Sequence, residues 1–423
     1  MKTRITIKKF ASLAKFLFVL FYLLFPGFGR AQFLYVTNRG SISITQYTGT
    51  GGVASIPSST NGLLVTSIGP DAFYDLPLVT GVIIPDTVTN LGVAAFSNCT
   101  GLTNVIMGKN IASIGDSAFA GCSVLTSITI PASVTSLGAG VFAGCNALAA
   151  ITVDPQNFSY SSVDGVLLNG NYTTLIEFPA GKGGNYAVPN GLDTIGIEAF
   201  LNCTNLTGVT IPASVYSLGD GAFSGCASLT NVALSSSLET IPPNAFEDCV
   251  DLTGVAIPIS VTDIDTNAFA YCGGLTSITI GNEVTSIQDG AFEYCSNLAG
   301  IYFQGNAPAT NATGFTGDNL ATAYYLPGAT GWTAAFDGIP TAPWVLPAPR
   351  ILNSGPGFGV LSNSFGFIIS WGTNATVVIE ATTDLAAPGW SPVGTNTLTG
   401  GSSYFSDSQW TNYARRFYRF RSP

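Results

Sequence analysis

Apolar positions along most of the chain recur with a period that is far longer than the two residues of a strand or the 3.6 residues of a helix. The stretch at residues 119–137, FAGCSVLTSITIPASVTSL, contains the pattern almost whole. An Ala-Phe pair, a Cys three residues after the Phe, and then Leu, Ile and Ile before a Pro return at a fixed interval. This regularity predicts a repeat protein.

The phenylalanines of the pattern define how far the repeat extends. Neighbouring copies are 23 residues apart, except for one interval of 58 residues, which is 35 longer than the period. The positions are Phe73, Phe96, Phe119, Phe142, Phe200, Phe223, Phe246, Phe269 and Phe292. The cysteines keep the same spacing at Cys99, Cys122, Cys145, Cys203, Cys226, Cys249, Cys272 and Cys295.

Each unit contains one short strand. In the motif L-x-x-I-x-I, which Leu125, Ile128 and Ile130 represent, alternate side chains point inward, and stacked copies form a parallel ladder. A second apolar pair, such as Val134 and Leu137, closes the coil. One coil cannot bury its own apolar side, so stability is shared between neighbours and the ends need caps.

Two further features predict how each coil turns. We expect the Gly after the second apolar pair to allow a tight corner, as at Gly115, Gly138, Gly196 and Gly219. Acidic residues stand two or three positions before several phenylalanines, and we expect them to cap a helical turn that carries the Ala-Phe pair. They are Asp71, Asp116, Glu198, Asp220 and Asp289.

The 35 additional residues predict a hairpin insertion at about residues 154–188. Its strands are expected from Val166 to Leu168 and from Thr173 to Phe178, with a turn at Asn169-Gly170. The repeat resumes afterwards at the same offset, so the solenoid should continue through the insertion. Both a lengthened coil and a protruding loop that contacts a ligand are compatible with this pattern.

The ends of the chain divide it into further regions. Residues 1–31 predict a signal peptide, because a basic stretch precedes the apolar core FLFVLFYLLF, and we expect cleavage after Ala31. A retained membrane anchor is the alternative, but a spanning helix needs about 20 apolar residues. Residues 32–303 form the predicted solenoid, beginning with a strand pair as its N-terminal cap. A C-terminal cap and a Pro-rich linker occupy residues 304–350. Residues 351–423 contain short strands between turns, which are typical of a small β-sandwich.

Composition and charge narrow the functional classes. Hydrophobic residues make up 46% of the chain and charged residues 9%, which predicts a substantial core. Outside residues 1–31 the chain carries 8 basic and 24 acidic residues, a net charge of −16. We therefore expect it to avoid nucleic acid and anionic membranes. No later segment predicts a transmembrane span.

Catalytic chemistry is not predicted. The chain has no histidine, and neither a Ser-x-x-Lys nor a G-x-S-x-G motif occurs. We therefore predict neither an enzyme nor a bound cofactor. Five acidic residues lie close together in sequence, at Glu247, Asp248, Asp251, Asp263 and Asp265, and a solvated acidic edge explains them better than a calcium site.

The eight cysteines leave three alternatives open. Equivalent positions in stacked coils lie about 4.8 Å apart, which is within the range for a disulfide. Their side chains would all point inward in parallel, however, and packing as free thiols is the favoured interpretation. Disulfides and a metal site are the alternatives, although the spacing matches no zinc motif.

The outward positions at the centre of the predicted ladder form the best candidate binding strip. They carry no charge and one aromatic side chain, so we expect weak multivalent contacts rather than a tight hot spot. A passive surface is the alternative. The positions are Ile83, Ile106, Thr129, Thr152, Thr210, Ala233, Ala256, Thr279 and Tyr302.

The consensus IP-x-SVTSIG-x-x-AF-x-GC-x-x-LTSITI resembles the BspA-type bacterial leucine-rich repeat over roughly residues 50–305. The C-terminal region, with its V-x-I-E-A-T-T-D-L run and final RFYRFR, resembles a fibronectin-like module of exported bacterial proteins. The resemblance implies a mainly β fold, a leucine-rich-repeat solenoid of about a dozen coils followed by a β-sandwich. It also implies a secreted or cell-surface protein that binds a protein or glycan ligand in adhesion. A passive envelope or matrix component and a non-catalytic polysaccharide-binding accessory module are the alternatives.

Overall fold

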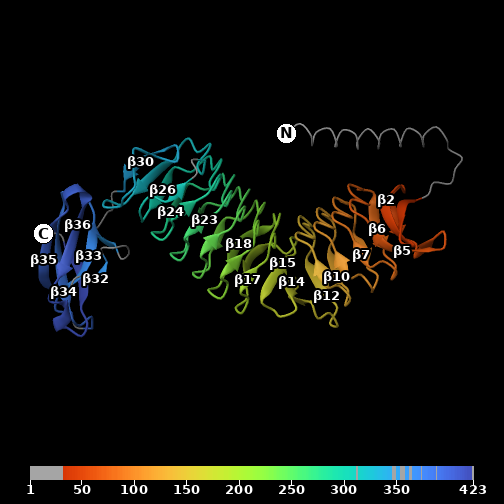
Figure 1. Cartoon of the computed structure of the whole chain (residues 1–423), viewed down its shortest axis with the longest axis horizontal. Coiled ribbons are helices and arrows are strands. Elements are labelled where there is room, and N and C mark those ends of the chain that lie inside the picture. The colour runs from red at the N-terminus through yellow and green to blue at the C-terminus, as the bar shows by residue number, and fades with distance from the viewer. Residues whose placement is uncertain are drawn as a thin grey trace.

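The computed structural model describes residues 32–310, 313–344, 349–352, 358–361, 364–372, 374–386 and 388–421, so the predicted signal peptide lies outside the described residues. The described chain is nearly all β-structure. It forms an elongated solenoid with a smaller β-module at its C-terminal end (Figure 1). The predicted fold class is therefore confirmed. No helix in these described ranges is long and apolar enough to cross a bilayer.

The N-terminal cap is built from a hairpin and two short strands. Strand β1 (Phe33–Asn38) pairs antiparallel with β2 (Ser41–Tyr47), as predicted, and β2 pairs in parallel with β5 (Leu63–Ile68). Strand β4 (Ser59–Thr60) pairs with β5. Tyr47 stacks on Phe73 with ring centroids 5.0 Å apart, so the cap covers the first coil.

Each coil contributes one longer strand to a parallel ladder, and the outward side of this ladder is called the strand face below. The strand face consists of β3 (Gly52–Ser55), β6 (Val79–Ile83), β8 (Asn104–Ile106), β10 (Ser127–Ile130), β12 (Ala150–Val153), β16 (Gly184–Ala187), β18 (Leu206–Thr210), β20 (Asn231–Ala233), β22 (Gly254–Val255), β24 (Ser277–Ile280), β26 (Gly300–Phe303), β28 (Thr322–Tyr325) and β30 (Ile339–Pro343).

A second ladder, in which most strands are two residues long, closes the coils on another side. After β5 it contains β7 (Asn90–Leu91), β9 (Ser113–Ile114), β11 (Ser136–Leu137), β15 (Thr174–Glu177), β17 (Thr194–Ile195), β19 (Ser217–Leu218), β21 (Thr240–Ile241), β23 (Asp263–Ile264), β25 (Ser286–Ile287) and β27 (Ala309–Thr310). Apolar side chains of both ladders pack against the repeat phenylalanines, which stack along the axis with centroids 4.7 Å apart at Phe73 and Phe96 and 5.3 Å apart at Phe269 and Phe292.

The prediction of a helical turn at the Ala-Phe pair is wrong. The described solenoid contains no helix there, and the phenylalanine stands between two corners with positive φ, two residues before it and two residues after it. Asp71 and Glu198 occupy the first corner, each with a φ of 56°. The carboxylate of Asp116 accepts a hydrogen bond of 3.1 Å from the N–H of Ala139 in the next coil. These acidic residues therefore shape corners or join coils, and they cap no helix.

The predicted role of the coil glycines is also corrected. Gly115, Gly138, Gly196 and Gly219 do not adopt positive φ. A Cβ on Gly138 would lie 2.3 Å from the backbone nitrogen of Asp116, and one on Gly219 would lie 2.3 Å from that of Ile197. Glycine is required here because adjacent coils approach closely, and the left-handed corners lie elsewhere.

The insertion contains the predicted hairpin, in which β14 (Val166–Asn169) pairs antiparallel with β15. A strand that was not predicted, β13 (Tyr160–Val163), pairs with β14 on its other side. Strand β15 pairs in parallel with β17, and Phe178 stacks on Phe200 at 4.9 Å. The insertion is therefore an additional coil, in which Phe178 takes the place of a repeat phenylalanine.

The two halves of the solenoid meet at this insertion. The hydrophobic core forms one cluster up to Leu167 and a second cluster that begins with Val166 and Leu168. The strand ladders are grouped into separate sheets on the two sides, because β12 ends one sheet and β16 begins another. The solenoid bends where β14 and β15 lie (Figure 1).

The C-terminal coils extend the repeat beyond its last cysteine. Phe315 stacks on Phe292 at 5.2 Å, and Trp332 packs on Phe303 at 4.7 Å to close the core. Strand β29 (Ala335–Phe336) forms a short hairpin with β30. These elements lie in the region predicted as the C-terminal cap.

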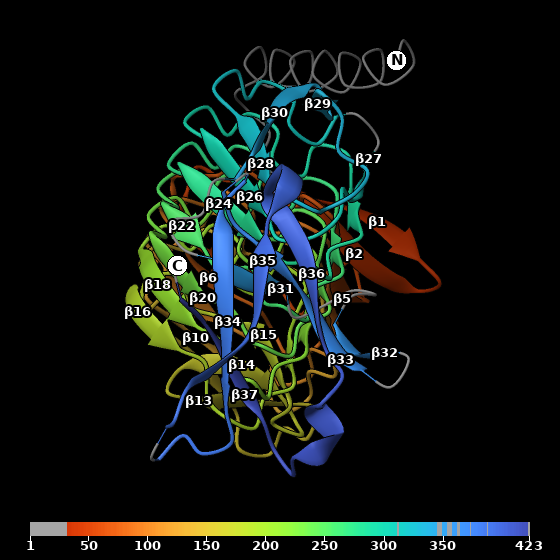
Figure 2. The same cartoon turned by 90° about the vertical axis from the view of Figure 1, so that its left-hand side faces the viewer.

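The C-terminal module consists of two antiparallel sheets (Figure 2). One contains β31 (Arg350–Leu352), β32 (Gly359–Leu361), β33 (Ser364–Ser370) and β36 (Ser402–Asp407). The other contains β34 (Thr376–Thr382), β35 (Ser391–Thr397) and β37 (Phe417–Arg421). Phe367 and Phe405 from the first sheet pack with Val377 and Ile379 from the second. Two short 3-10 turns, η1 (Thr399–Gly401) and η2 (Trp410–Asn412), lie in its loops.

Candidate functional site

The structure places the nine predicted strip positions in one row along the strand face. Ile83 lies opposite Ile106, Thr129 opposite Thr152, and Thr210 opposite Ala233 in parallel register. Ala256 bridges to Thr279, which lies opposite Tyr302. Eight of the nine side chains are exposed and that of Tyr302 is half-buried.

Four further residues belong to the same row. Ser55 precedes Ile83, Ala187 precedes Thr210, and Tyr324 and Ala342 follow Tyr302 in register. The sequence signal for Tyr324 is the strand-like TAYYLP. Tyr324 follows Tyr302 by 22 residues, however, so the 23-residue spacing of the repeat does not predict its place in the row. The row is interrupted between Thr152 and Ala187, where the insertion separates the two sheets.

The chemistry of the row changes from one end of the solenoid to the other. Ile83 and Ile106, near the N-terminal end, are 39% and 51% exposed. Hydroxyl groups follow, and those of Thr129 and Thr152 are hydrogen-bonded to each other at 2.8 Å.

Aromatic side chains gather at the C-terminal end of the row. Tyr302 stacks on Tyr324 at 5.1 Å and contacts Trp344 at 5.0 Å. The guanidinium of Arg350 lies 5.9 Å from the Trp344 ring, within the range of a cation–π interaction. We call Tyr302, Tyr324 and Trp344 the aromatic end of the row. Aromatic and arginine side chains are the types that dominate binding hot spots, so this end is better suited to tight contacts than sequence analysis indicated.

The cysteines line the interior of the solenoid. All eight side chains are buried free thiols, and each donates a hydrogen bond to the backbone carbonyl of a phenylalanine in the preceding coil. The distance is 3.1 Å from Cys226 to Phe200 and 3.0 Å from Cys295 to Phe269. Burial raises the pKa of Cys99 and of Cys226 to about 12. These thiols are therefore protonated at neutral pH and unsuited to nucleophilic chemistry.

The densest acidic group in the sequence separates into two parts. Burial, and then the charge of Asp248, raises the pKa of Glu247. Burial, and then the charges of Asp263 and Asp220, raises the pKa of Asp265. Within the described ranges no group of three or more acidic, cysteine or histidine side chains is placed to hold a metal ion.

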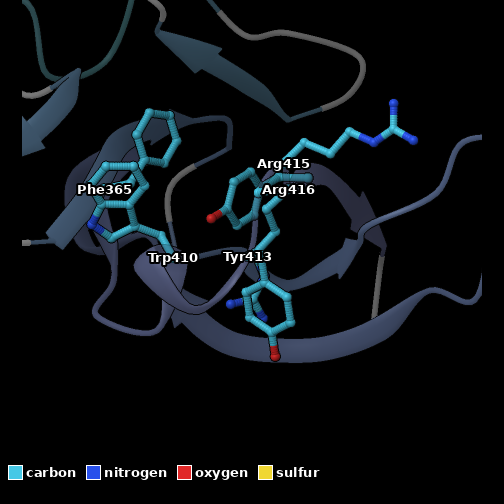
Figure 3. A pocket seen from close by; sticks show the side chains of 7 residues that line it. Phe365, Trp410, Tyr413, Arg415 and Arg416 are labelled. Carbon is cyan, nitrogen blue, oxygen red and sulfur yellow. The ribbon is translucent and has the colours of Figure 1, made fainter.

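The C-terminal module contains a shallow pocket of about 230 Å³ that sequence analysis did not identify (Figure 3). Phe365 and Tyr418 stack at 5.6 Å, and Trp410 lies 6.5 Å from Phe365. Arg416 forms a 2.8 Å ion pair with the buried Asp407, and Arg415 points away from the rings (Figure 3). Of the residues around this pocket, the sequence pattern singles out only the final RFYRFR, which predicts a strand. Because Arg416 is paired with Asp407 and stacks over the ring of Tyr413 at 4.4 Å, and Arg415 points away from the rings, we place the candidate site on the strand face and not in this pocket.

Comparison with known proteins identifies the repeat. A family model described as the BspA type leucine rich repeat region matches residues 66–174 and 184–316 in 6 copies. No curated protein sequence matches the chain.

Several solved bacterial structures are similar to the chain. The pneumococcal vaccine antigen PcpA is 19% identical over 71% of this chain and 93% of its own, with a TM-score of 0.56. A leucine rich cell surface protein of Faecalibacterium prausnitzii is 28% identical over 66% of this chain and 95% of its own, with a TM-score of 0.41. A leucine-rich repeat protein of Eubacterium ventriosum is 23% identical over 64% and 88%, with a TM-score of 0.44. The likeness to PcpA supports the fold. Because the family model covers more than half of the chain, this protein belongs to the BspA-type leucine-rich-repeat family.

Proposed function

We propose that this protein is an exported or cell-surface binding protein that engages a protein or glycan ligand through the strand face, without catalysis. The observation that carries the proposal is the uncharged row that runs along both halves of the solenoid. Its predicted positions are exposed up to Thr279, and it leads to the half-buried aromatic side chains Tyr302, Tyr324 and Trp344.

Repetition gives such a face its binding strength. Similar hydroxyl and small side chains recur once per coil, so a polymeric or multivalent ligand makes many weak contacts at once, and each added contact acts at high effective concentration. The aromatic end adds larger apolar contacts where the solenoid meets the C-terminal module. Adhesion to neighbouring cells or matrix is the function that this combination supports best.

Export and surface display belong to the same proposal. Residues 1–31 have the composition of a signal peptide, and a cell-surface leucine-rich-repeat protein is among the similar solved structures. The C-terminal module is proposed to hold or display the solenoid. Localising the protein with and without residues 351–423 tests this role, and unchanged surface retention of the shortened protein would remove it.

The binding proposal is tested by probing arrays of glycans and extracellular-matrix proteins with purified protein. We expect the Tyr302→Ala/Tyr324→Ala variant to lose binding by at least about 10-fold. A second variant, Thr210→Lys/Thr279→Lys, places charges on two exposed row positions without removing core contacts, and it should lose binding as well.

The control uses another tyrosine pair of the same geometry. Tyr271 and Tyr294 stack at 5.3 Å and are 42% and 49% exposed, but they lie at the corners after the repeat phenylalanines. Tyr271→Ala/Tyr294→Ala should bind as the unmodified protein does. Uniform absence of binding on the arrays, or equal losses in the row and corner variants, would overturn the proposal.

A further inference from the structure

The insertion carries the most exposed large apolar side chain of the described chain. Phe158 is 94% exposed, whereas the repeat phenylalanines are completely or almost completely buried. Tyr172, in the turn between β14 and β15, is 57% exposed. Single exposed apolar residues are common on protein surfaces, so exposure alone assigns no role to them.

The backbone that presents Phe158 is held by its neighbour Asn157. The buried Asn157 side chain donates to the carbonyls of Pro131 at 2.8 Å and Val134 at 3.0 Å in the preceding coil. Its oxygen accepts from the N–H groups of Ser159 at 2.8 Å and Tyr160 at 2.9 Å. These four hydrogen bonds fix the turn on both sides of Phe158 without any contribution from the phenyl ring.

The turn that presents Tyr172 is fixed in the same way. Asn169 donates to the hydroxyls of Thr173 at 3.0 Å and Thr174 at 3.2 Å, and its oxygen accepts from the N–H groups of the same two residues at 2.9 and 3.0 Å. An asparagine side chain with four hydrogen bonds thus stands beside each exposed aromatic residue.

The two turns are joined to each other. The N–H of Gly170 donates to the carbonyl of Ser159 at 2.8 Å, and Tyr160 lies opposite Asn169 in the β13–β14 pair. A Cβ on Gly170 would lie 2.2 Å from the carbonyl oxygen of Phe158, so the backbones of the two turns are in direct contact. Phe158 and Tyr172 therefore project from one end of one rigid small sheet.

From this arrangement we infer that Phe158 and Tyr172 form a preformed aromatic anchor for a partner protein with an apolar socket bordered by basic residues. Preorganisation lowers the entropic cost of binding, and aromatic side chains that fill pockets carry most of the energy in protein interfaces. The inference concerns a different surface from the strand face and does not depend on the proposed function.

Charge decides the kind of partner. Residues 32–344 contain 21 acidic and 3 basic residues, a net charge of −18, which opposes both an anionic membrane and a second copy of the same solenoid. A basic rim on a protein socket complements the acidic solenoid and increases the rate of association.

The test begins with p-benzoyl-phenylalanine in place of Phe158 or, as a control, in place of Tyr216, which is 60% exposed and lies outside the insertion. Ultraviolet light is applied to producing cells, and we expect a crosslinked protein that is specific to position 158. That protein is then purified and its affinity is measured by calorimetry for the unmodified protein, for Phe158→Ser/Tyr172→Ser and for Tyr216→Ser.

The double variant should bind at least about 10-fold more weakly, and Tyr216→Ser should bind within about 2-fold of the unmodified protein. The inference is overturned if position 158 gives no specific crosslink, or if the double variant binds the captured protein as tightly as the unmodified chain. It is also overturned if vesicles of phosphatidylcholine and phosphatidylglycerol bind the unmodified protein and not the double variant, because the anchor would then serve a membrane.

Discussion

The backbone N–H of Phe142 donates a 2.6 Å hydrogen bond to Oε1 of Glu177, a buried carboxyl group 35 residues later in the chain. In a regular coil the equivalent N–H donates to a carbonyl of the next coil, as Phe119 does to Val141 at 2.9 Å. The insertion displaces that carbonyl, and the Glu177 side chain takes its place. One titratable group therefore joins the two halves of the solenoid.

This joint predicts a dependence of stability on pH. Burial raises the pKa of Glu177 from 4.5 to about 8, the N–H of Phe142 opposes this effect, and the neighbouring carboxyl of Glu198 adds to it. Glu177 also acts electrostatically on the thiol of Cys203, and Glu177 takes part in none of the described ion pairs. The folded chain keeps the proton that the unfolded chain releases near pH 4.5. The contribution of the protonated Glu177 carboxyl to the free energy of unfolding is fully present below pH 4.5 and is lost as the pH rises toward 8.

We expect the free energy of unfolding to fall by on the order of 3–4 kcal/mol between pH 5 and pH 8, measured by urea denaturation. Glu177→Gln keeps the acceptor oxygen without the charge, so its stability should depend less on pH and exceed that of the unmodified protein at pH 8. Asp86→Asn, in an exposed pair with Lys109, is the control and should leave the pH dependence unchanged. Equal pH dependence with and without Glu177 would contradict the argument.

A second buried carboxyl lies at the end of the cysteine row. Asp318 follows Phe315 by three residues, as each cysteine follows its phenylalanine, and Leu76 has this place in the first coil. Asp318 is 4% exposed and neither oxygen has a hydrogen-bond partner. Burial raises the pKa of Asp318 to about 8.

Asp318→Cys should therefore stabilise the protein at pH 8 by about 1–2 kcal/mol, because a thiol at this position can donate to the carbonyl of Phe292 as its counterparts do. Asp318→Leu removes the buried carboxyl without adding a thiol donor, so it measures the effect of the carboxyl alone. It should stabilise the protein as well. Thermal unfolding of the three proteins measures both effects. A lower midpoint in both variants would show that the Asp318 carboxyl is stabilised in the fold, for example by the nearby backbone N–H of Cys295, which opposes the rise in its pKa.

The regular part of the fold was predictable because each coil repeats the same packing. Phe73 to Phe142 and Phe200 to Phe292 keep an interval of 23 residues, and the strand register of Thr129 with Thr152 follows from it. Phe178 and Phe315 do not follow from the pattern because each lacks both the preceding Ala and the following cysteine, and Phe178 also breaks the interval. The corners were misjudged because acidic residues before an apolar pair suggest a helix cap, whereas Asp71 and Glu198 adopt positive φ.

The candidate site was predictable from the sequence only where the 23-residue spacing of the repeat is kept. The row from Ile83 to Tyr302 follows from phase alone, but its aromatic end depends on how Tyr324 and Trp344 pack on Tyr302. Phe158 gave no signal at all, since the hydrogen bonds that fix its turn come from Pro131 and Val134, more than 20 residues earlier in the chain.

The close approach of coils predicts a severe effect of single methyl groups. Gly138→Ala and Gly219→Ala each place a Cβ 2.3 Å from backbone nitrogen of the preceding coil, where the atom that must move belongs to the backbone. We expect each to destabilise the protein by about 3 kcal/mol or more. Gly254→Ala, where nothing lies within 4 Å of the added Cβ, should be neutral or slightly stabilising in the same chemical denaturation measurement.

Thiol titration tests the state of the cysteine row. Native protein at pH 8 should react negligibly with a maleimide, since all eight thiols are buried and burial raises the pKa of Cys99 and of Cys226 to about 12. In denaturant without a reductant, all 8 cysteines should react. Fewer reactive thiols under those conditions would demonstrate disulfides and disprove the interpretation of a free row.

Two phenylalanines of the insertion, Phe158 and Phe178, are 20 residues apart and have different roles: Phe178 stabilises the fold, and Phe158 is proposed to bind a partner. Phe178 is 2% exposed, stacks on Phe200 at 4.9 Å and packs against the tilted ring of Tyr186 at 4.7 Å, whereas Phe158 is 94% exposed. Phe178→Ala removes the ring that begins the second core and should cost about 3–5 kcal/mol of unfolding free energy.

Phe158→Ala should change the unfolding free energy by less than about 0.5 kcal/mol, because the turn is held by Asn157 and not by the ring. Asn157→Ala is the complementary variant. It should destabilise the turn, since it leaves two N–H groups and two carbonyls without their partner. Hydrogen exchange of Ser159 and Tyr160 measures this directly: their N–H groups should stay protected in Phe158→Ala and lose protection in Asn157→Ala. If Phe158→Ala instead lowered stability as much as Phe178→Ala, the exposed ring would have a structural role and its assignment to a partner would lose its basis.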